Sequence, residues 1–155
     1  EVRESKKIDL AENRYKLVKS YLEDKGLYED KYIYHGGRTY HDGYKVMKQI
    51  IDRDELPTAF FIGNDSMSIG ALTALYEAGI RVPEHMSIIG YNDITNAEFT
   101  LPPLTTVKVY TELMGEKAYE LLIDRLKGRD IPLKIITPTK LIVRNTVGKV
   151  QEETQ

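Results

Sequence analysis

Cysteine is absent from this chain of 155 residues, which excludes disulfide bonds, cysteine-ligated zinc and a cysteine nucleophile. The absence fits a reducing compartment, although exported proteins without cysteine are also common. No apolar run approaches the roughly 20 residues that a membrane-spanning helix needs. Excess positive charge is lacking too, because the formal net charge is -2. We therefore do not expect this segment itself to bind nucleic-acid phosphates.

Motifs of common enzyme and nucleotide sites are also missing. The sequence has no glycine fingerprint for a dinucleotide and no GxSxG nucleophile turn, and residues 63–70 do not contain the lysine of a phosphate-binding loop. The histidines do not have the spacing of a metal pair. We expect no enzyme activity, no cofactor and no bound metal. An α/β enzyme that uses Asp65 or Asp93 for acid–base chemistry is a rival hypothesis, which a turnover assay would test.

The composition that remains is that of a globular domain, with 41% hydrophobic and 30% charged residues. Apolar periodicity predicts helices, and short runs rich in aromatic and β-branched residues predict strands. The predicted helices cover 9–25, 41–52, 65–79 and 111–127, and the predicted strands cover 31–35, 59–63, 87–91, 105–109, 133–137 and 140–144. This alternation predicts an α/β fold, a mostly parallel sheet with helices on both faces.

The same polar pair follows two neighbouring predicted strands. Asn64 and Asp65 follow the strand at 59–63, and Asn92 and Asp93 follow the strand at 87–91. Parallel strands joined by a helix end at the same edge of the sheet, where open α/β sheets bind ligands. Amide and carboxylate groups there predict a site for a small polar molecule. Two alternatives stay open: Asp65 is also a good helix N-cap, and Asn-Asp is also a common turn pair.

The predicted helix at 65–79 is apolar on nearly all sides. A helix of this kind must be covered on more than one side. One side faces its own sheet, and we interpret the other as a surface for a partner chain.

Two successive runs of the sequence carry a family resemblance, PTAFFIGNDSMSIGALTALYEAGIRVPEHMSIIGYNDI and LPPLTTVKVYTELMGEKAYELLIDRLKG. Their joint order and spacing strongly resemble the lactose/galactose repressor (LacI/GalR) family of bacterial transcription factors. Proteins of that family carry an N-terminal helix-turn-helix, followed by a two-lobed core like the sugar-binding proteins of bacterial importers. The resemblance implies a periplasmic-binding-protein-like lobe of type I, a fragment without the helix-turn-helix and without most of the first lobe.

The resemblance also implies how the chain is divided. Residues 1–100 form the second lobe of the effector-binding domain. Residues 101–130 form a crossover strand and helix that pack on the first lobe, and residues 131–148 return to the second lobe. Residues 149–155 form a flexible tail.

The function implied is the effector-binding and dimerising part of a cytoplasmic transcriptional repressor. A sugar or sugar derivative binds between the two lobes and alters operator binding, and the homodimer contacts DNA only through the helix-turn-helix. No membrane contact is expected. The alternative is a periplasmic sugar-binding protein of an ABC importer, which shares the fold and would carry an export signal.

The site residues follow from the same resemblance. From the residues alone, we interpret Arg14 as an exposed charge on a polar helix face. Its ligand-binding role is implied by the family resemblance. The implied ligand-binding residues are Arg14, Arg38, Tyr40, Asn64, Asn92 and Asp93. The implied dimer-interface residues are Met67, Gly70, Ala71, Ala74, Leu75, Ala97 and Leu101.

Overall fold

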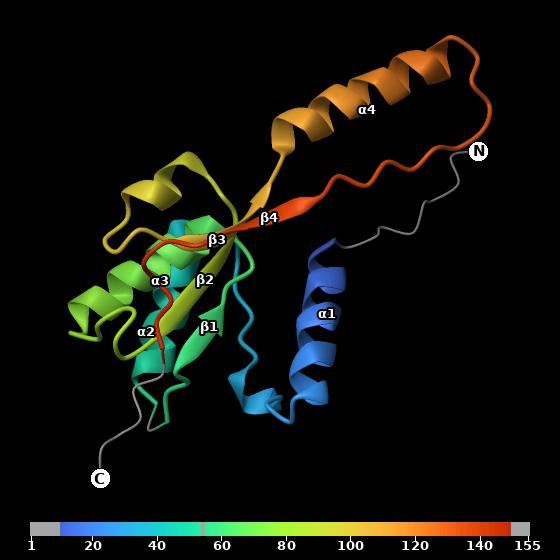
Figure 1. Cartoon of the computed structure of the whole chain (residues 1–155). Helices are drawn as coiled ribbons and strands as arrows, with labels where there is room; N and C mark the ends of the chain where they lie inside the picture. The colour runs from blue at the N-terminus through green and yellow to red at the C-terminus, as the bar shows by residue number, and fades with distance from the viewer. Residues whose placement is uncertain (1–9, 54, 150–155) are drawn as a thin grey trace. The chain divides into compact units, whose positions relative to one another are not determined.

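The structure is a computed structural model that describes residues 10–53 and 55–149, and side chains from residue 14 onward. The chain divides into two compact units, the first ending at Gly37 and the second beginning at Arg38 (Figure 1). No helix within the described ranges is long and apolar enough to cross a membrane. The predicted tail at 149–155 lies, except for its first residue, outside the described residues.

The first unit contains the helix α1 (Leu10–Asp24) and the 3-10 turn η1 (Asp30–Tyr32). α1 ends in a glycine stop, because Gly26 has a φ of 67° and the Leu27 N–H donates to the Leu22 carbonyl at 2.8 Å. The helix predicted at 9–25 is therefore confirmed over its described part.

The strand predicted at 31–35 is wrong. The Tyr32 and Ile33 N–H groups donate back to the carbonyls of Glu29 and Asp30, at 3.1 Å each, and close a turn instead. The Asp30 carboxylate also accepts the Tyr28 hydroxyl at 2.6 Å. These local hydrogen bonds outweigh the strand preference of the aromatic residues, which is a weak and context-dependent signal.

The second unit is an α/β layer built on a four-stranded sheet. Its elements in chain order are α2 (Tyr40–Ile51), β1 (Ala59–Phe61), α3 (Asp65–Glu77), β2 (Ser87–Asn92), η2 (Thr95–Phe99), β3 (Thr105–Val109), α4 (Thr111–Leu126) and β4 (Thr139–Ile142). The strand order is β1-β2-β3-β4, with β1, β2 and β3 parallel and β4 antiparallel to β3. The predicted mostly parallel sheet is confirmed. Helical cover on both faces stays a prediction, because α1 belongs to the other unit.

The core lies between β2, α3 and α2. Two glycines let the helices cross closely: a Cβ on Gly43 would collide with the Met67 backbone, and one on Gly70 would collide with the Tyr40 carbonyl. Large apolar side chains fill the remaining space, and their burial supplies most of the favourable free energy of folding. The fully or nearly fully buried ones are Met47, Ile50, Leu75, Met86, Ile88 and Leu104.

After η2, the chain leaves the sheet later than at the predicted boundary before residue 101. Leu104, Thr105 and Thr106 are buried in the sheet of this unit, so the part that leaves the sheet begins only after Val109. No residue of α4 is buried, and 133–137 forms no strand. The strand predicted at 140–144 is present as β4, shifted by a residue or two. Packing of α4 on another lobe stays a prediction.

Candidate functional site

The carboxyl ends of β1 and β2 lie side by side, as the repeated polar pair predicts. Phe61 is paired with Ile89 in parallel register, and the Ile62 N–H donates to the Ile89 carbonyl at 2.9 Å. The chain then continues into Asn64 after β1, and β2 itself ends at Asn92. Both asparagines therefore lie at one edge of the sheet, the edge where open α/β sheets bind ligands.

Asn64 is the N-cap of α3, a role that the sequence alternative gave to Asp65. Its Oδ1 accepts the Met67 N–H at 2.9 Å, and its extended backbone is typical of a cap residue. Asn64 is half-buried, and within the described ranges its Nδ2 donates no hydrogen bond. The cap thus fixes the amide and leaves two N–H donors for a polar ligand.

Asp65 is fully buried, and its carboxylate makes contacts within the chain. Its Oδ2 accepts the Ile94 N–H at 2.9 Å, and its Oδ1 accepts the Thr106 hydroxyl at 2.6 Å. A Cβ on Gly90 would collide with Oδ1, so the neighbouring strand presses closely on this carboxylate. The acid–base role kept open for Asp65 is therefore not supported, because a substrate has no access to the group.

The turn after β2 has an unusual backbone. Asn92 has a φ of 122° and Asp93 a φ of 59°, both in the region that L side chains rarely adopt. The turn alternative is thus confirmed for the backbone of this pair. Such residues cost about 1–3 kcal/mol each and persist only where their surroundings hold them. Asn92 is half-buried at the end of the strand, beside its β3 partner Lys108.

The Asp93 carboxylate makes ion pairs within the chain. Its Oδ1 forms an ion pair with Arg144 Nη2 at 2.7 Å, and its Oδ2 lies 3.5 Å from Lys108 Nζ. The Asp93 side chain is only 9% exposed and that of Arg144 only 18%. Both carboxylate oxygens are engaged inside the chain, so Asp93 is an internal anchor for the turn. The same pairing argues against Asp93 as an acid–base group.

The remaining predicted ligand residues lie in two places. Arg14 is half-buried in α1 of the first unit, whereas Arg38 and Tyr40 lie at the start of the second. Arg38 is exposed, and the Tyr40 hydroxyl accepts the Asn96 amide at 3.5 Å. Tyr40 therefore lies next to the segment that follows the Asn92 turn. A cluster of metal-ligating side chains is not found in the part of the chain that the structure describes.

The predicted dimer-interface residues are mostly interior. Five of them are buried within the chain itself: Gly70, Ala71, Ala74, Leu75 and Ala97. The apolar character of α3 has an internal reason, because β2 covers one side of the helix and α2 covers another. Met67 is half-buried, and only Leu101 is fully accessible, at 89% exposed.

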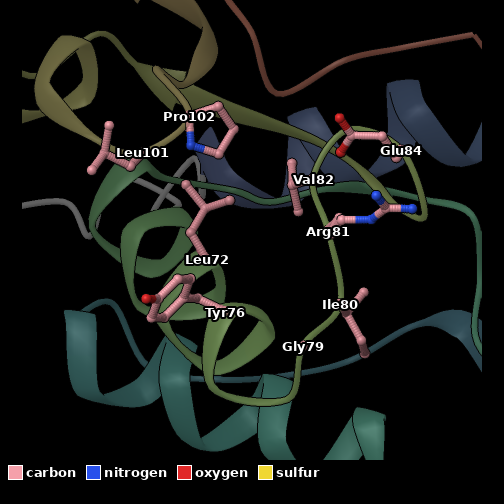
Figure 2. A pocket seen from close by; sticks show the side chains of 9 residues that line it. All are labelled: Leu72, Tyr76, Gly79, Ile80, Arg81, Val82, Glu84, Leu101 and Pro102. Carbon is pink, nitrogen blue, oxygen red and sulfur yellow. The ribbon is translucent and has the colours of Figure 1, made fainter.

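A patch of large apolar side chains does remain on the outer side of α3. Tyr76 is 82% exposed and Phe99 is 73% exposed, and with Leu101 they flank two shallow pockets. Figure 2 shows Leu72 and Tyr76 of α3 in one of these pockets, together with Leu101 and Pro102. We call Ile69, Leu72, Tyr76, Phe99 and Leu101 the outer apolar surface. A spacing of three or four residues between 69, 72 and 76 was the sequence signal for it.

Known proteins match most of the chain. The periplasmic binding protein-like domain family matches residues 3–147. The HTH-type transcriptional repressor MelR of Bacillus subtilis (strain 168) is 54% identical over 112 residues, which are 72% of this chain and 33% of that protein. The lactose operon repressor of Rhizobium radiobacter is 38% identical over 107 residues, which are 69% of this chain and 95% of that sequence. The chain thus spans about a third of the length of MelR.

Solved structures agree with the sequence relatives. The complex of the transcriptional regulator CelR with cellobiose matches with a TM-score of 0.81 and 36% identity, over 86% of this chain and 41% of that one. A LacI family regulator from Enterococcus faecium with bound ribose matches with a TM-score of 0.83 and 26% identity, over 91% and 53%. A dimeric Lac repressor matches with a TM-score of 0.69 and 29% identity, over 73% and 42%. The predicted resemblance is confirmed: the chain belongs to the periplasmic binding protein-like domain family, as LacI-type transcriptional regulators carry it.

Proposed function

We propose that the chain is the effector-binding and dimerising part of a cytoplasmic transcriptional repressor whose effector is a sugar or sugar derivative. The observation that carries the proposal is the pair of amide side chains, Asn64 and Asn92, at one edge of the parallel sheet. Neutral amides donate and accept hydrogen bonds at once, which suits hydroxyl groups. The relatives described above are transcriptional regulators, and two similar structures hold cellobiose and ribose.

Three more residues complete the proposed effector site. Arg14, Arg38 and Tyr40 are added by the family resemblance, and Tyr40 also lies beside the η2 segment. Asp93 is left out, because both of its oxygens are engaged within the chain. We assign no catalytic step to these residues, and the named regulators among the relatives support a binding role over an enzyme.

The rest of the repressor lies outside the described fold. In the proposal, a helix-turn-helix and a first lobe of a longer protein supply the DNA contact and the opposite wall of the sugar site. The exposed apolar side chains of α4, including Leu122 and Leu126, then pack on that first lobe. A ligand that binds the closed arrangement of the lobes more tightly shifts the population toward it, and the paired DNA-binding heads move with the lobes. The importer alternative is less favoured, because the relatives that match are regulators.

Dimerisation is proposed through the outer apolar surface. This surface keeps the two segments that the resemblance implied, α3 and the stretch around 97–101, and its exposed members are Tyr76, Phe99 and Leu101. Large aromatic and apolar side chains are typical of the buried centre of a protein interface. A similar structure is a dimeric Lac repressor, which is consistent with this use.

Asn64 allows a direct test in the full-length protein. Asn64→Ser keeps an oxygen that can cap α3 but removes the free Nδ2 donors, whereas Asn64→Ala removes both. We expect both variants to weaken binding of cellobiose or ribose about tenfold, since an unpaired sugar hydroxyl costs about 1–3 kcal/mol. Titration calorimetry measures the affinity for the sugar, and thermal unfolding measures the stability that the helix cap contributes.

The two measurements distinguish a role of Asn64 in sugar binding from its role in stability. Only Asn64→Ala should also lower the stability, by about 1 kcal/mol, the typical value of an N-cap. Unchanged sugar affinity in Asn64→Ser would remove Asn64 from the site. No binding of either sugar to the unmodified protein, with release of a different class of molecule on denaturation, would contradict the sugar assignment.

A further inference from the structure

The turn after β2 is held from both sides by carboxylates. On one side Asp65 Oδ2 accepts the Ile94 N–H at 2.9 Å, and on the other Asp93 Oδ1 pairs with Arg144 Nη2 at 2.7 Å. The backbone of Asn92 and Asp93, directly before the anchored Ile94 amide, has φ values of 122° and 59°. A conformation that these residues rarely adopt has to be imposed by its surroundings. The two anchors are the groups in position to impose it.

Both anchors end on the same buried stretch of β3 and the residue before it. Arg144 Nη1 donates to the Leu104 carbonyl at 2.8 Å, and the Arg144 backbone N–H donates to Thr105 Oγ1 at 2.9 Å. Asp65 Oδ1 accepts the Thr106 hydroxyl at 2.6 Å. These three β3-side residues are at most 2% exposed. The turn is therefore tied to the interior of the sheet at two separate points.

We propose that Asp93 and Arg144 are positioning residues of the effector site. Their ion pair holds the positive-φ backbone of Asn92 and Asp93 and thereby sets Asn92 in place at the sheet edge. The inference rests on the proposed function, in which Asn92 contacts the effector. It gives Asp93 an indirect role through the backbone, in place of the direct contact implied by the family resemblance.

The physical consequence is preorganisation. With the ion pair intact, the turn is ordered before the effector arrives, and binding does not have to order it. Without Arg144, Asp93 keeps only the more distant Lys108, whose side chain is 42% exposed and lies 3.5 Å away. The turn then samples other conformations, and the apparent affinity falls by the fraction of molecules that still hold the competent one.

The test uses the full-length protein and either cellobiose or ribose, whichever the unmodified protein binds more tightly. Arg144→Met removes the ion pair, and Asn92→Gly removes the amide while allowing the same φ. Met47→Ala, in the α2 core, is the matched control that lowers stability at a distance from the turn. Calorimetric titration at a temperature where all variants are folded gives the affinity, and hydrogen exchange gives the protection of the Ile94 amide.

We expect Arg144→Met to weaken sugar binding at least tenfold and to speed exchange of the Ile94 amide at least tenfold. Met47→Ala should leave the sugar affinity unchanged. Asn92→Gly should weaken binding by itself, and the double variant with Arg144→Met should bind no more weakly than Asn92→Gly. This non-additivity is a readout that a merely structural role of Arg144 would not produce.

Three results overturn the inference. Wild-type affinity in Arg144→Met does so directly, and additive losses in the double variant do so by showing that Arg144 acts independently of Asn92. If the unmodified protein binds neither sugar and releases a different class of molecule on denaturation, the proposed function falls and the inference falls with it. Should Arg144→Met not fold, Asp93→Asn removes the charge while keeping the shape, and its affinity and Ile94 exchange decide in the same way.

Discussion

The Asp65 carboxylate connects segments that lie far apart in the sequence. Fully buried at the start of α3, it accepts hydrogen bonds from the Ile94 backbone and the Thr106 hydroxyl and lies against Gly90. Hydrogen bonds to an ionised acceptor are stronger than neutral ones and offset part of the cost of burial. Asp93 is likewise consumed by internal contacts with Arg144. At this edge of the sheet, therefore, both carboxylates are engaged in contacts within the chain.

Glu77 gives a residue-scale prediction about pH. Its carboxylate accepts the Tyr44 hydroxyl at 2.7 Å and lies 3.1 Å from Lys48 Nζ. The hydrogen bond from Tyr44, and secondly the one from Lys48, lower the pKa of Glu77 below its ordinary value of 4.5. Because the folded state binds this proton less tightly, the contribution to stability is present above about pH 4.5 and is lost as the pH falls below it. Between pH 6 and pH 3, roughly the range over which carboxylates titrate, we expect the melting temperature to change less in Glu77→Gln than in the wild type.

The matched control is Glu84→Gln, an exposed glutamate in the loop before β2. Its melting curve should follow the wild type across the same range. Equal pH dependence in Glu77→Gln and the wild type would show that the contact between α2 and α3 at Glu77 contributes nothing measurable in solution.

At the scale of elements, the crossing of α2 and α3 depends on glycine rather than on large side chains. Gly43 and Gly70 bring each helix against backbone of the other, at Met67 and Tyr40. The helix ends follow local rules instead: Thr39 and Asp42 form a reciprocal capping box at the start of α2. Local rules depend only on neighbours in the chain, whereas the crossing depends on two segments meeting.

A pair of glycine-to-alanine changes tests the crossing. In Gly70→Ala the new Cβ collides with the Tyr40 carbonyl, and overpacking of this kind costs about 1–3 kcal/mol. In Gly115→Ala, within α4, nothing lies within 4 Å of the new Cβ, and removing a helical glycine stabilises by about 1 kcal/mol. In urea unfolding of the 155-residue chain, the free energy of unfolding should therefore fall for Gly70→Ala and rise for Gly115→Ala. Equal effects would mean that the close approach of α2 and α3 is absent in solution.

At the scale of the whole molecule, the sheet and α2 together cover α3 and leave one outer apolar surface. Tyr76 and Leu101 are 82% and 89% exposed there, more than the other large apolar side chains around these pockets. Their exposure is costly in water unless a second surface covers them. The proposed dimer places them at its centre.

A charge at this surface should separate the subunits. We expect Tyr76→Glu and Leu101→Glu to convert a full-length dimer to a monomer at micromolar concentration, since each buries an unpaired carboxylate in an apolar interface. Light scattering after size exclusion measures the mass. Leu27→Glu, at a side chain that is 66% exposed after α1, is the control and should leave the dimer intact. Dimers that persist in both surface variants would place the interface elsewhere.

Several features were determined by the sequence itself. The alternating periodicities predicted the sheet and its helices, and two of these helices end before glycines with positive φ, Gly26 at 67° and Gly79 at 70°. The repeated Asn-Asp pair predicted that two strand ends meet at one edge, and the register of β1 and β2 confirms it. These features depend on hydrogen bonds and patterns within short stretches of chain, so they can be read locally.

The tertiary structure alone decided which contacts the members of the polar pairs make. Asn64 rather than Asp65 caps α3, and Asp93 is drawn to Arg144, a residue that lies 51 positions further along the chain. The tertiary structure also decided that Ala74 and Leu75 belong to the core. The side of α3 that we had interpreted as a surface for a partner chain is covered by α2. Burial and ion pairing depend on which distant segments meet, and that meeting is a property of the whole fold rather than of any local pattern.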